Sequence, residues 1–134
     1  MYTALVSSSL FPLHERLKRH DTVRVRRAME AAQWWPADRL ASATVERLRA
    51  LLSDIGANVP YYRDMFRERG FEPSSVTGVA DLQRLPFLTK GLIRANTDAL
   101  KHAHSRDLSR FNTGGSSGEP LIFFIGKGRV SHDV

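Results

Sequence analysis

A run of glycine and hydroxyl residues near the end of the sequence sets the strictest limit on its backbone. Residues 113–120 read Thr-Gly-Gly-Ser-Ser-Gly-Glu-Pro, and five strongly strand-forming residues, Leu121–Ile125, follow them. Because glycine adopts dihedral angles that other residues resist, such a run turns the chain instead of extending a helix or strand. The pattern predicts a strand, a glycine-serine loop and a second strand, together spanning residues 109–126.

The sequence before this hairpin has the periodicity of helices. Around residues 25–32 one apolar stripe recurs with helical spacing, and Trp34-Trp35-Pro36 ends it, because the residue before proline is pushed away from helical dihedral angles. We expect the two tryptophans to bury against the next helix. The stripe consists of Val25, Ala28, Met29 and Ala32.

A longer helix is predicted to begin near Pro36 or Ala37 and to end with Gly56 as its C-terminal cap. Pro60 is well placed as the first residue of the following helix, which Gly70 closes. The apolar side of the longer helix consists of Leu40, Val45, Leu48, Leu51, Leu52 and Ile55.

From residue 71 to residue 104 the predicted elements are short. One or two helical turns over Val79–Leu85 end at Pro86, and Thr89 is a candidate cap for a further turn. His102 and His104 have an H-x-H spacing that metal sites use, but no third ligand accompanies them, so we favour a solvated helix end. The predicted fold class is α+β, with short helices over residues 10–105 followed by the hairpin.

Composition limits the function classes further. The chain has 134 residues, 42% of them apolar and 25% charged, which fits one soluble globular domain, and it has no cysteine, which excludes thiolate catalysis and disulfides. No stretch approaches the roughly 20 apolar residues that span a bilayer. We therefore expect a cytoplasmic protein with no membrane partner.

A net charge of +6 raises the question of a nucleic-acid partner. The excess lies in one early segment, in which Glu15, Asp21 and Glu30 offset only part of the positive charge. We favour a solvated helix face, or a surface covered by a larger protein, over nucleic-acid binding. The alternative, a non-catalytic basic helical module that binds nucleic acid or a protein partner, stays open. The basic residues are Arg16, Lys18, Arg19, Arg24, Arg26 and Arg27.

The loop has the chemistry of a phosphate site. Phosphate binding needs backbone N–H groups that point at one place, hydroxyl donors and room for close approach. The hydroxyls would come from Thr113, Ser116 and Ser117, and the clearance from Gly114, Gly115 and Gly118. The loop matches neither the P-loop nor the G-x-G-x-x-G pattern, and a plain hairpin connection rich in glycine and serine is the alternative.

Three motifs carry a resemblance to a known family. The run Thr113–Leu121 resembles the T-[SG]-G-[ST]-[ST]-G-x-P phosphate loop of the adenylate-forming superfamily. Its two adjacent glycines and Leu121 resemble most the loop of the phenylacetate-CoA ligase-like branch. That branch includes CapK proteins of capsular polysaccharide biosynthesis and coenzyme F390 synthetases. Val59–Arg63 resembles that branch's "VPYYR" helix. Asp81–Lys90 resembles its "DLxxLPxLTK" segment.

The resemblance implies the N-terminal part of an adenylate-forming domain, truncated and without a second domain. The family attaches a small-molecule carboxylate to the α-phosphate of ATP, with Mg²⁺ offsetting phosphate charge, and passes the acyl group to CoA or another acceptor. If the family's roles apply to the matching residues of this chain, residues 113–118 would hold the β- and γ-phosphates of ATP. The resemblance assigns no catalytic residue and no metal ligand to this chain. Many relatives have Lys where this chain has Leu121. We expect the chain to be inactive alone and to need the C-terminal portion of the ligase.

Overall fold

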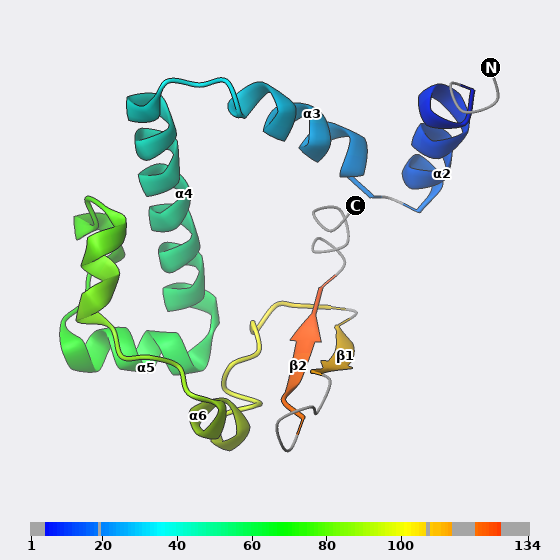
Figure 1. Ribbon diagram of the computed structural model, residues 1–134. Helices are drawn as coiled ribbons and strands as arrows, with labels where there is room; N and C mark the ends of the chain where they lie inside the picture. Colours follow the sequence, from blue (N-terminus) through cyan, green and yellow to red (C-terminus); the bar gives the residue numbers. More distant parts are fainter. Residues whose placement is uncertain (1–4, 19, 107, 114–119, 127–134) are drawn as a thin grey trace. The chain divides into compact units, whose positions relative to one another are not determined.

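A computed structural model describes residues 5–18, 20–106, 108–113 and 120–126 (Figure 1). The described residues group into two compact units, one formed by the chain up to Trp35 together with Ile125 and Gly126, and the other by Pro36–Phe124. None of the helices in the described ranges is both long enough and apolar enough to cross a membrane.

The N-terminal unit contains a π-helical turn η1 (Val6–Leu10) and the helices α2 (Phe11–Leu17) and α3 (Thr22–Ala32). Helix α3 contains the whole predicted apolar stripe, which confirms that helix. Only two described side chains of this unit are buried, Glu15 and Thr22, and both are polar. Large apolar residues such as Leu17 and Met29 stay exposed.

The buried polar pair connects α2 to α3. The Thr22 hydroxyl donates to the Glu15 carboxylate, and His20 Nδ1 lies 3.3 Å from the same oxygen, Oε2. The pKa of Glu15 lies below its ordinary value. The hydrogen bond from Thr22 is the largest cause, His20 and His14 make smaller contributions in the same direction, and burial acts in the opposite direction. The backbone N–H of His20 also donates to the Glu15 carbonyl at 2.9 Å, so one residue organises the connection through both its side chain and its backbone.

The prediction that both tryptophans are buried is wrong for Trp34, whose exposed fraction is 82%. Helix α3 ends at Ala32, and the N–H of Trp35 bonds to the Ala32 carbonyl at 3.0 Å, which places both residues in a turn. In a turn, side chains no longer follow the helical stripe, so the apolar periodicity does not apply to Trp34. Trp35 is partly buried.

The second unit is built on α4 (Ala37–Asn58) and α5 (Pro60–Arg69). Val59, with extended dihedral angles, separates the two helices, and Pro60 is the first residue of α5 as predicted. Gly70 ends α5 with a φ of 56°, the left-handed conformation that favours glycine, which confirms the predicted stop.

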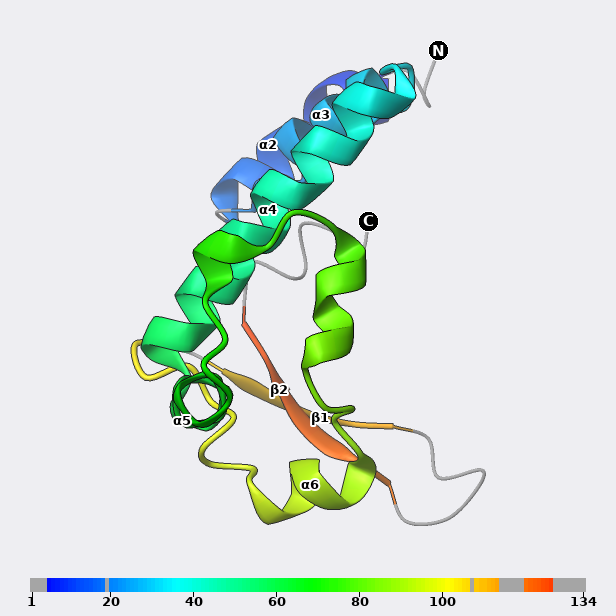
Figure 2. The same ribbon diagram turned by 90° about the vertical axis from the view of Figure 1, so that its left-hand side faces the viewer.

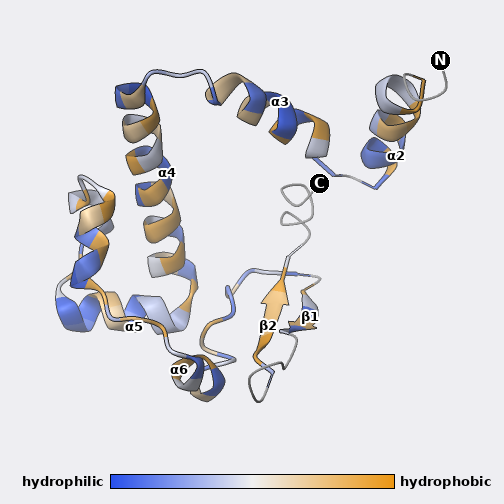
Figure 3. Cartoon of the chain, in the orientation of Figure 1, coloured by the Kyte–Doolittle hydropathy of each residue, from blue (hydrophilic) through white to orange (hydrophobic). Residues whose placement is uncertain are grey.

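The core of this unit is small. Leu52 of α4 packs with Phe66 of α5 and with Phe71 and Val76 in the following segment, and the Phe66 and Phe71 ring centroids lie 4.9 Å apart. Arg49 Nε donates to the Val76 carbonyl at 2.5 Å and ties that segment to α4. Apolar residues of α4, α5 and the following segment therefore form one core. Figure 3 shows the hydropathy of each residue along the chain. The partly buried residues around this core are Leu48, Ile55, Tyr62, Met65, Leu82 and Leu85.

The predicted role of Gly56 is wrong. Helix α4 continues through Gly56 to Asn58, so Gly56 is not its cap. A Cβ atom at this position would lie 2.9 Å from Cδ2 of the Phe66 ring. Glycine is present because α5 approaches α4 closely at this point, which is information about tertiary packing that helix-end rules do not contain.

Short elements follow the core. They are the 3₁₀ helices η2 (Pro73–Ser75) and η3 (Val79–Arg84) and the helix α6 (Lys90–Ala95). The Asp81 carboxylate begins η3 by accepting hydrogen bonds from the Thr77 and Gly78 N–H groups, and these hydrogen bonds lower the pKa of Asp81. Thr89 Oγ1 accepts from the Leu92 N–H at 3.3 Å, which confirms the predicted cap of α6.

The last described segments form a two-stranded antiparallel hairpin of β1 (Ser109–Asn112) and β2 (Ile122–Ile125), seen from a second side in Figure 2. The described residues are thus mostly helical with one hairpin, which is compatible with the predicted α+β fragment. Both strands lie within the range predicted for them, residues 109–126.

We expect Gly70→Ala to lower the free energy of unfolding by about 1–2 kcal/mol, because alanine is strained at positive φ. Gly78→Ala is the matched control: Gly78 has an extended φ of −163°, and no atom lies within 4 Å of the place that a Cβ would occupy. It should be neutral or stabilise by up to about 1 kcal/mol. Urea unfolding of the two variants measures the difference, and equal effects would contradict the role assigned to Gly70.

Acid should weaken the connection between α2 and α3. Since the folded pKa of Glu15 is lowered, its contribution to stability is complete above the ordinary value of 4.5 and is lost as the pH falls through the lower folded value. Thr22→Val removes the largest cause and should raise the pKa of Glu15, as measured by NMR titration of its carboxyl carbon. Thr44→Val, which removes a hydroxyl bonded to Leu40 in α4, should leave that titration unchanged.

Candidate functional site

The hairpin that carries the predicted loop is held by cross-strand packing. The Phe111 and Phe123 rings stack with centroids 6.3 Å apart and an interplanar angle of 25°. Strand β1 is exposed along its length, whereas β2 is partly buried. The apolar strand β2 is therefore the partly buried side of the hairpin, and β1 is its solvent-exposed side.

Thr113 closes the base of the loop. Its N–H donates to the Leu121 carbonyl at 3.0 Å, and its side-chain Oγ1 accepts from the Leu121 N–H, also at 3.0 Å. Both hydrogen bonds join the residue before the glycine-serine run to the residue after Pro120. Because Oγ1 acts as the acceptor, the hydroxyl proton of Thr113 is still available for a further acceptor such as a phosphate oxygen.

Thr113 is the only predicted phosphate-binding residue whose position the structure gives. Gly114, Gly115, Ser116, Ser117 and Gly118 lie outside the described residues, as does Glu119. The roles of all six predicted residues therefore stay predictions, although the two strands and the closure by Thr113 put the ends of the loop side by side.

Sequence patterns did not predict a cation beside β2. Lys101 Nζ lies 4.2 Å from the centroid of the Phe124 ring and 2.7 Å from Asp98 Oδ1, and this pairing lowers the pKa of Asp98. Lys101 also lines a small pocket of about 270 Å³ with residues of α6 and β2, among them Ile93 and Ile122. The contact between Lys101 and Phe124 joins distant parts of the sequence, so no local spacing rule could have found it.

The H-x-H pair has a structural contact instead of being simply solvated. His102 Nε2 lies 3.4 Å from Asp54 Oδ1 of α4, and the Ala103 N–H donates to the Asn58 carbonyl at 2.7 Å. The hydrogen bond from Asn58 is the main cause that lowers the pKa of Asp54, and the hydrogen bond with His102 lowers it further. His102 thus links α4 to the segment before β1, whereas the His104 side chain is exposed. Among the described residues no group of three or more potential metal-ligating side chains occurs.

The other two motifs mainly build the support of the hairpin. In the segment Val59–Arg63, Val59 is buried, and the Tyr61 N–H donates to the Ala99 carbonyl at 3.0 Å. In Asp81–Lys90, Asp81 starts η3, and Leu82 and Leu85 pack on the core. These residues position the segments that lead to β1, and they show no cluster of side chains suited to chemistry.

Comparison with known proteins gives an independent test of the resemblance. No family model matches the chain. The chain is 32% identical over 87 residues to a phenylacetate-coenzyme A ligase of Aromatoleum evansii, which covers 63% of this chain and 20% of that protein. It is 27% identical over 96 residues to a phenylacetate-coenzyme A ligase of Thermus thermophilus, covering 65% of this chain and 20% of that protein.

A third relative is the protein CapK of Staphylococcus aureus, 26% identical over 89 residues, which cover 66% of this chain and 20% of CapK. The chain therefore spans about one fifth of the length of these curated relatives. Both protein names agree with the branch that the three motifs predicted. The chain is therefore similar to curated proteins named phenylacetate-coenzyme A ligase and CapK, which confirms the predicted resemblance to the phenylacetate-CoA ligase-like branch.

Proposed function

We propose that this chain supplies the phosphate-binding part of an ATP-dependent acid ligase of the phenylacetate-CoA ligase-like type. The single observation that carries the proposal is the closure of the hairpin by Thr113, which brings together the two ends of a loop with the family's phosphate-binding sequence. The names of the curated relatives support the reaction class. The domain is proposed to be the N-terminal part of an adenylate-forming domain.

In the proposed reaction a carboxylate oxygen of the substrate attacks the α-phosphorus of ATP, and pyrophosphate leaves. The resulting acyl-adenylate is then attacked by the thiol of CoA, or by another acceptor, and AMP leaves. The loop would act before and during the first step, because hydroxyl and N–H donors at Thr113–Gly118 hold the β- and γ-phosphates in position for in-line displacement. None of these residues acts as a nucleophile.

The support for each small molecule differs. ATP fits the sequence of the loop and the hydroxyl of Thr113, whose proton has no acceptor among the described residues. Mg²⁺ would offset phosphate charge, but the described residues hold no group of three metal ligands, and we assign none of them to it. CoA is suggested only by the names of the relatives. Because the match covers one fifth of those relatives, we also propose that the chain needs the remaining part of a ligase to turn over.

Thr113→Val should open the base of the loop while leaving the backbone bond to the Leu121 carbonyl in place. Loss of one neutral hydrogen bond of about 1 kcal/mol should make the Leu121 amide exchange roughly fivefold faster. Thr113→Ser keeps the oxygen and should restore slow exchange. Hydrogen-exchange NMR measures this, and identical rates in the valine and serine variants would show that the side chain does not close the loop.

In a ligase polypeptide that contains this chain, replacing Ser116 and Ser117 by alanine should raise KM for ATP at least about tenfold, since each hydroxyl bond to a charged oxygen contributes about 1.5–3 kcal/mol. Steady-state kinetics with varied ATP measures the effect. Ser109→Ala, on exposed β1 outside the loop, is the control and should change neither constant. An unchanged KM and kcat in the double variant would count against phosphate binding by the loop.

A further inference from the structure

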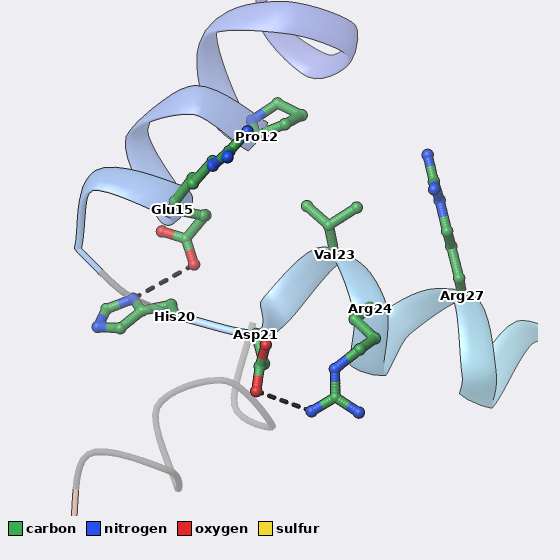
Figure 4. A pocket seen from close by; sticks show the side chains of 8 residues that line it. Pro12, Glu15, His20, Asp21, Val23, Arg24 and Arg27 are labelled. Atoms are coloured by element: carbon green, nitrogen blue, oxygen red, sulfur yellow. Dashed lines mark hydrogen bonds and ion pairs between the residues drawn. The ribbon is translucent and has the colours of Figure 1, made fainter.

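A cleft of about 590 Å³ lies between α2 and α3 in the N-terminal unit (Figure 4). Pro12 of α2 and Val23 of α3 give it apolar surface, and three arginines line it: Arg16, Arg24 and Arg27. Figure 4 shows Val23 and Arg27 extending from α3 on the same side of the helix. The cleft belongs entirely to this unit and is separate in sequence from the loop at residues 113–118.

The two carboxylates of the cleft already have partners. Glu15 is buried and accepts a hydrogen bond from the Thr22 hydroxyl, with His20 Nδ1 at 3.3 Å from its Oε2 and His14 Nδ1 at 3.5 Å from its Oε1. Asp21 Oδ2 lies 2.7 Å from Arg24 NH2. The negative charge in the cleft is therefore engaged by these neighbours, which reduces its repulsion of an incoming anion.

Two of the three guanidinium groups have no such partner among the residues that the structure describes. Arg16 and Arg27 make no ion pair with any residue in the described ranges, and both side chains are exposed. Arg26, the neighbour of Arg27 on α3, differs in both respects: it pairs with Glu30 at 3.4 Å and does not line the cleft. On α3, therefore, Arg27 lines the cleft without an ion pair among the described residues, whereas its neighbour Arg26 lies outside the cleft and is paired with Glu30.

We propose that this cleft binds a phosphate-bearing ligand, with Arg16 and Arg27 donating to its phosphate oxygens and Pro12 and Val23 contacting the apolar part of the molecule. Guanidinium groups suit this role, because their planar N–H forks match phosphate oxygens in pairs. The phosphate can belong to a soluble phosphorylated compound or to a lipid headgroup, since both present the same oxygens. The proposed site contains no residue of the loop at 113–118, so this proposal does not depend on whether the chain belongs to a working ligase.

The test uses the whole chain with Ser116 and Ser117 replaced by alanine, so that the predicted loop does not contribute. Sodium pyrophosphate is titrated at constant ionic strength while the side-chain Nε–H resonances of the arginines are followed by NMR. Arg16→Gln and Arg27→Gln should each weaken binding about tenfold or more, because each removes charge-assisted hydrogen bonds to the ligand. The matched control Arg26→Gln removes the same charge from α3, the helix that carries Arg27, and should change binding less than about twofold.

A parallel arm uses phosphatidylcholine vesicles with and without phosphatidic acid. Binding of pyrophosphate that depends on Arg16 and Arg27 identifies a soluble phosphate compound as the ligand, and the same dependence seen only with phosphatidic acid identifies a headgroup. Three results would overturn the proposal. The first is that Arg26→Gln weakens binding as much as Arg16→Gln and Arg27→Gln do, and the second is that neither pyrophosphate nor the vesicles bind. The third is that a single-stranded oligonucleotide binds more tightly than either probe and all three substitutions weaken its binding equally. Circular dichroism checks that each variant keeps its helices.

Discussion

The close contact between the Phe66 ring and Gly56 is the interaction on which the second unit depends. It lets α5 approach α4, and the ring then packs with Leu52, Phe71 and Val76 in the only described cluster of buried apolar residues. The segments that lead to the hairpin are attached to this pair of helices through backbone hydrogen bonds from Tyr61 to Ala99 and from Ala103 to Asn58. A larger residue at position 56 would therefore disturb more than one helix pair, because the support of the hairpin would move with it.

Local chemistry explains which parts of this fold the sequence could predict. Proline at the start of a helix, glycine at a left-handed end and threonine at an N-cap act through neighbouring backbone groups, and Pro60, Gly70 and Thr89 all have their predicted roles. The cap rule fails at Gly56 because the true reason for that glycine, a ring ten residues later in the chain, is not a local property. Hydrophobicity alone predicts a buried Trp34, although this residue falls in a turn.

The candidate site also combines features that the local sequence predicts with features that only the tertiary structure reveals. The glycines and hydroxyls of the loop are adjacent in sequence, so their pattern could suggest phosphate binding, and together with the motifs at residues 59–63 and 81–90 it suggested the family. The double contact of Thr113 with Leu121 follows from pairing the strands around that loop. Lys101, in contrast, contacts Phe124 because the fold brings the segment after α6 beside β2. Its charge is paired with Asp98, which keeps it beside the hairpin without leaving an isolated cation on an apolar strand.

Exposed apolar surface on the second unit bears on the proposed need for a longer ligase. A groove of about 540 Å³ runs between α4, α5 and the segment around η3, and Leu51 and Phe87 in its lining are 56% and 94% exposed. Soluble proteins seldom leave large contiguous apolar surface in water unless another surface covers it. The apolar surface of α4 is wider than α5 and η3 can cover, because they bury Leu52 but leave its neighbour Leu51 exposed. Covering this stripe with further polypeptide would remove it from water, which supports the view that the helical support is one layer of a larger domain.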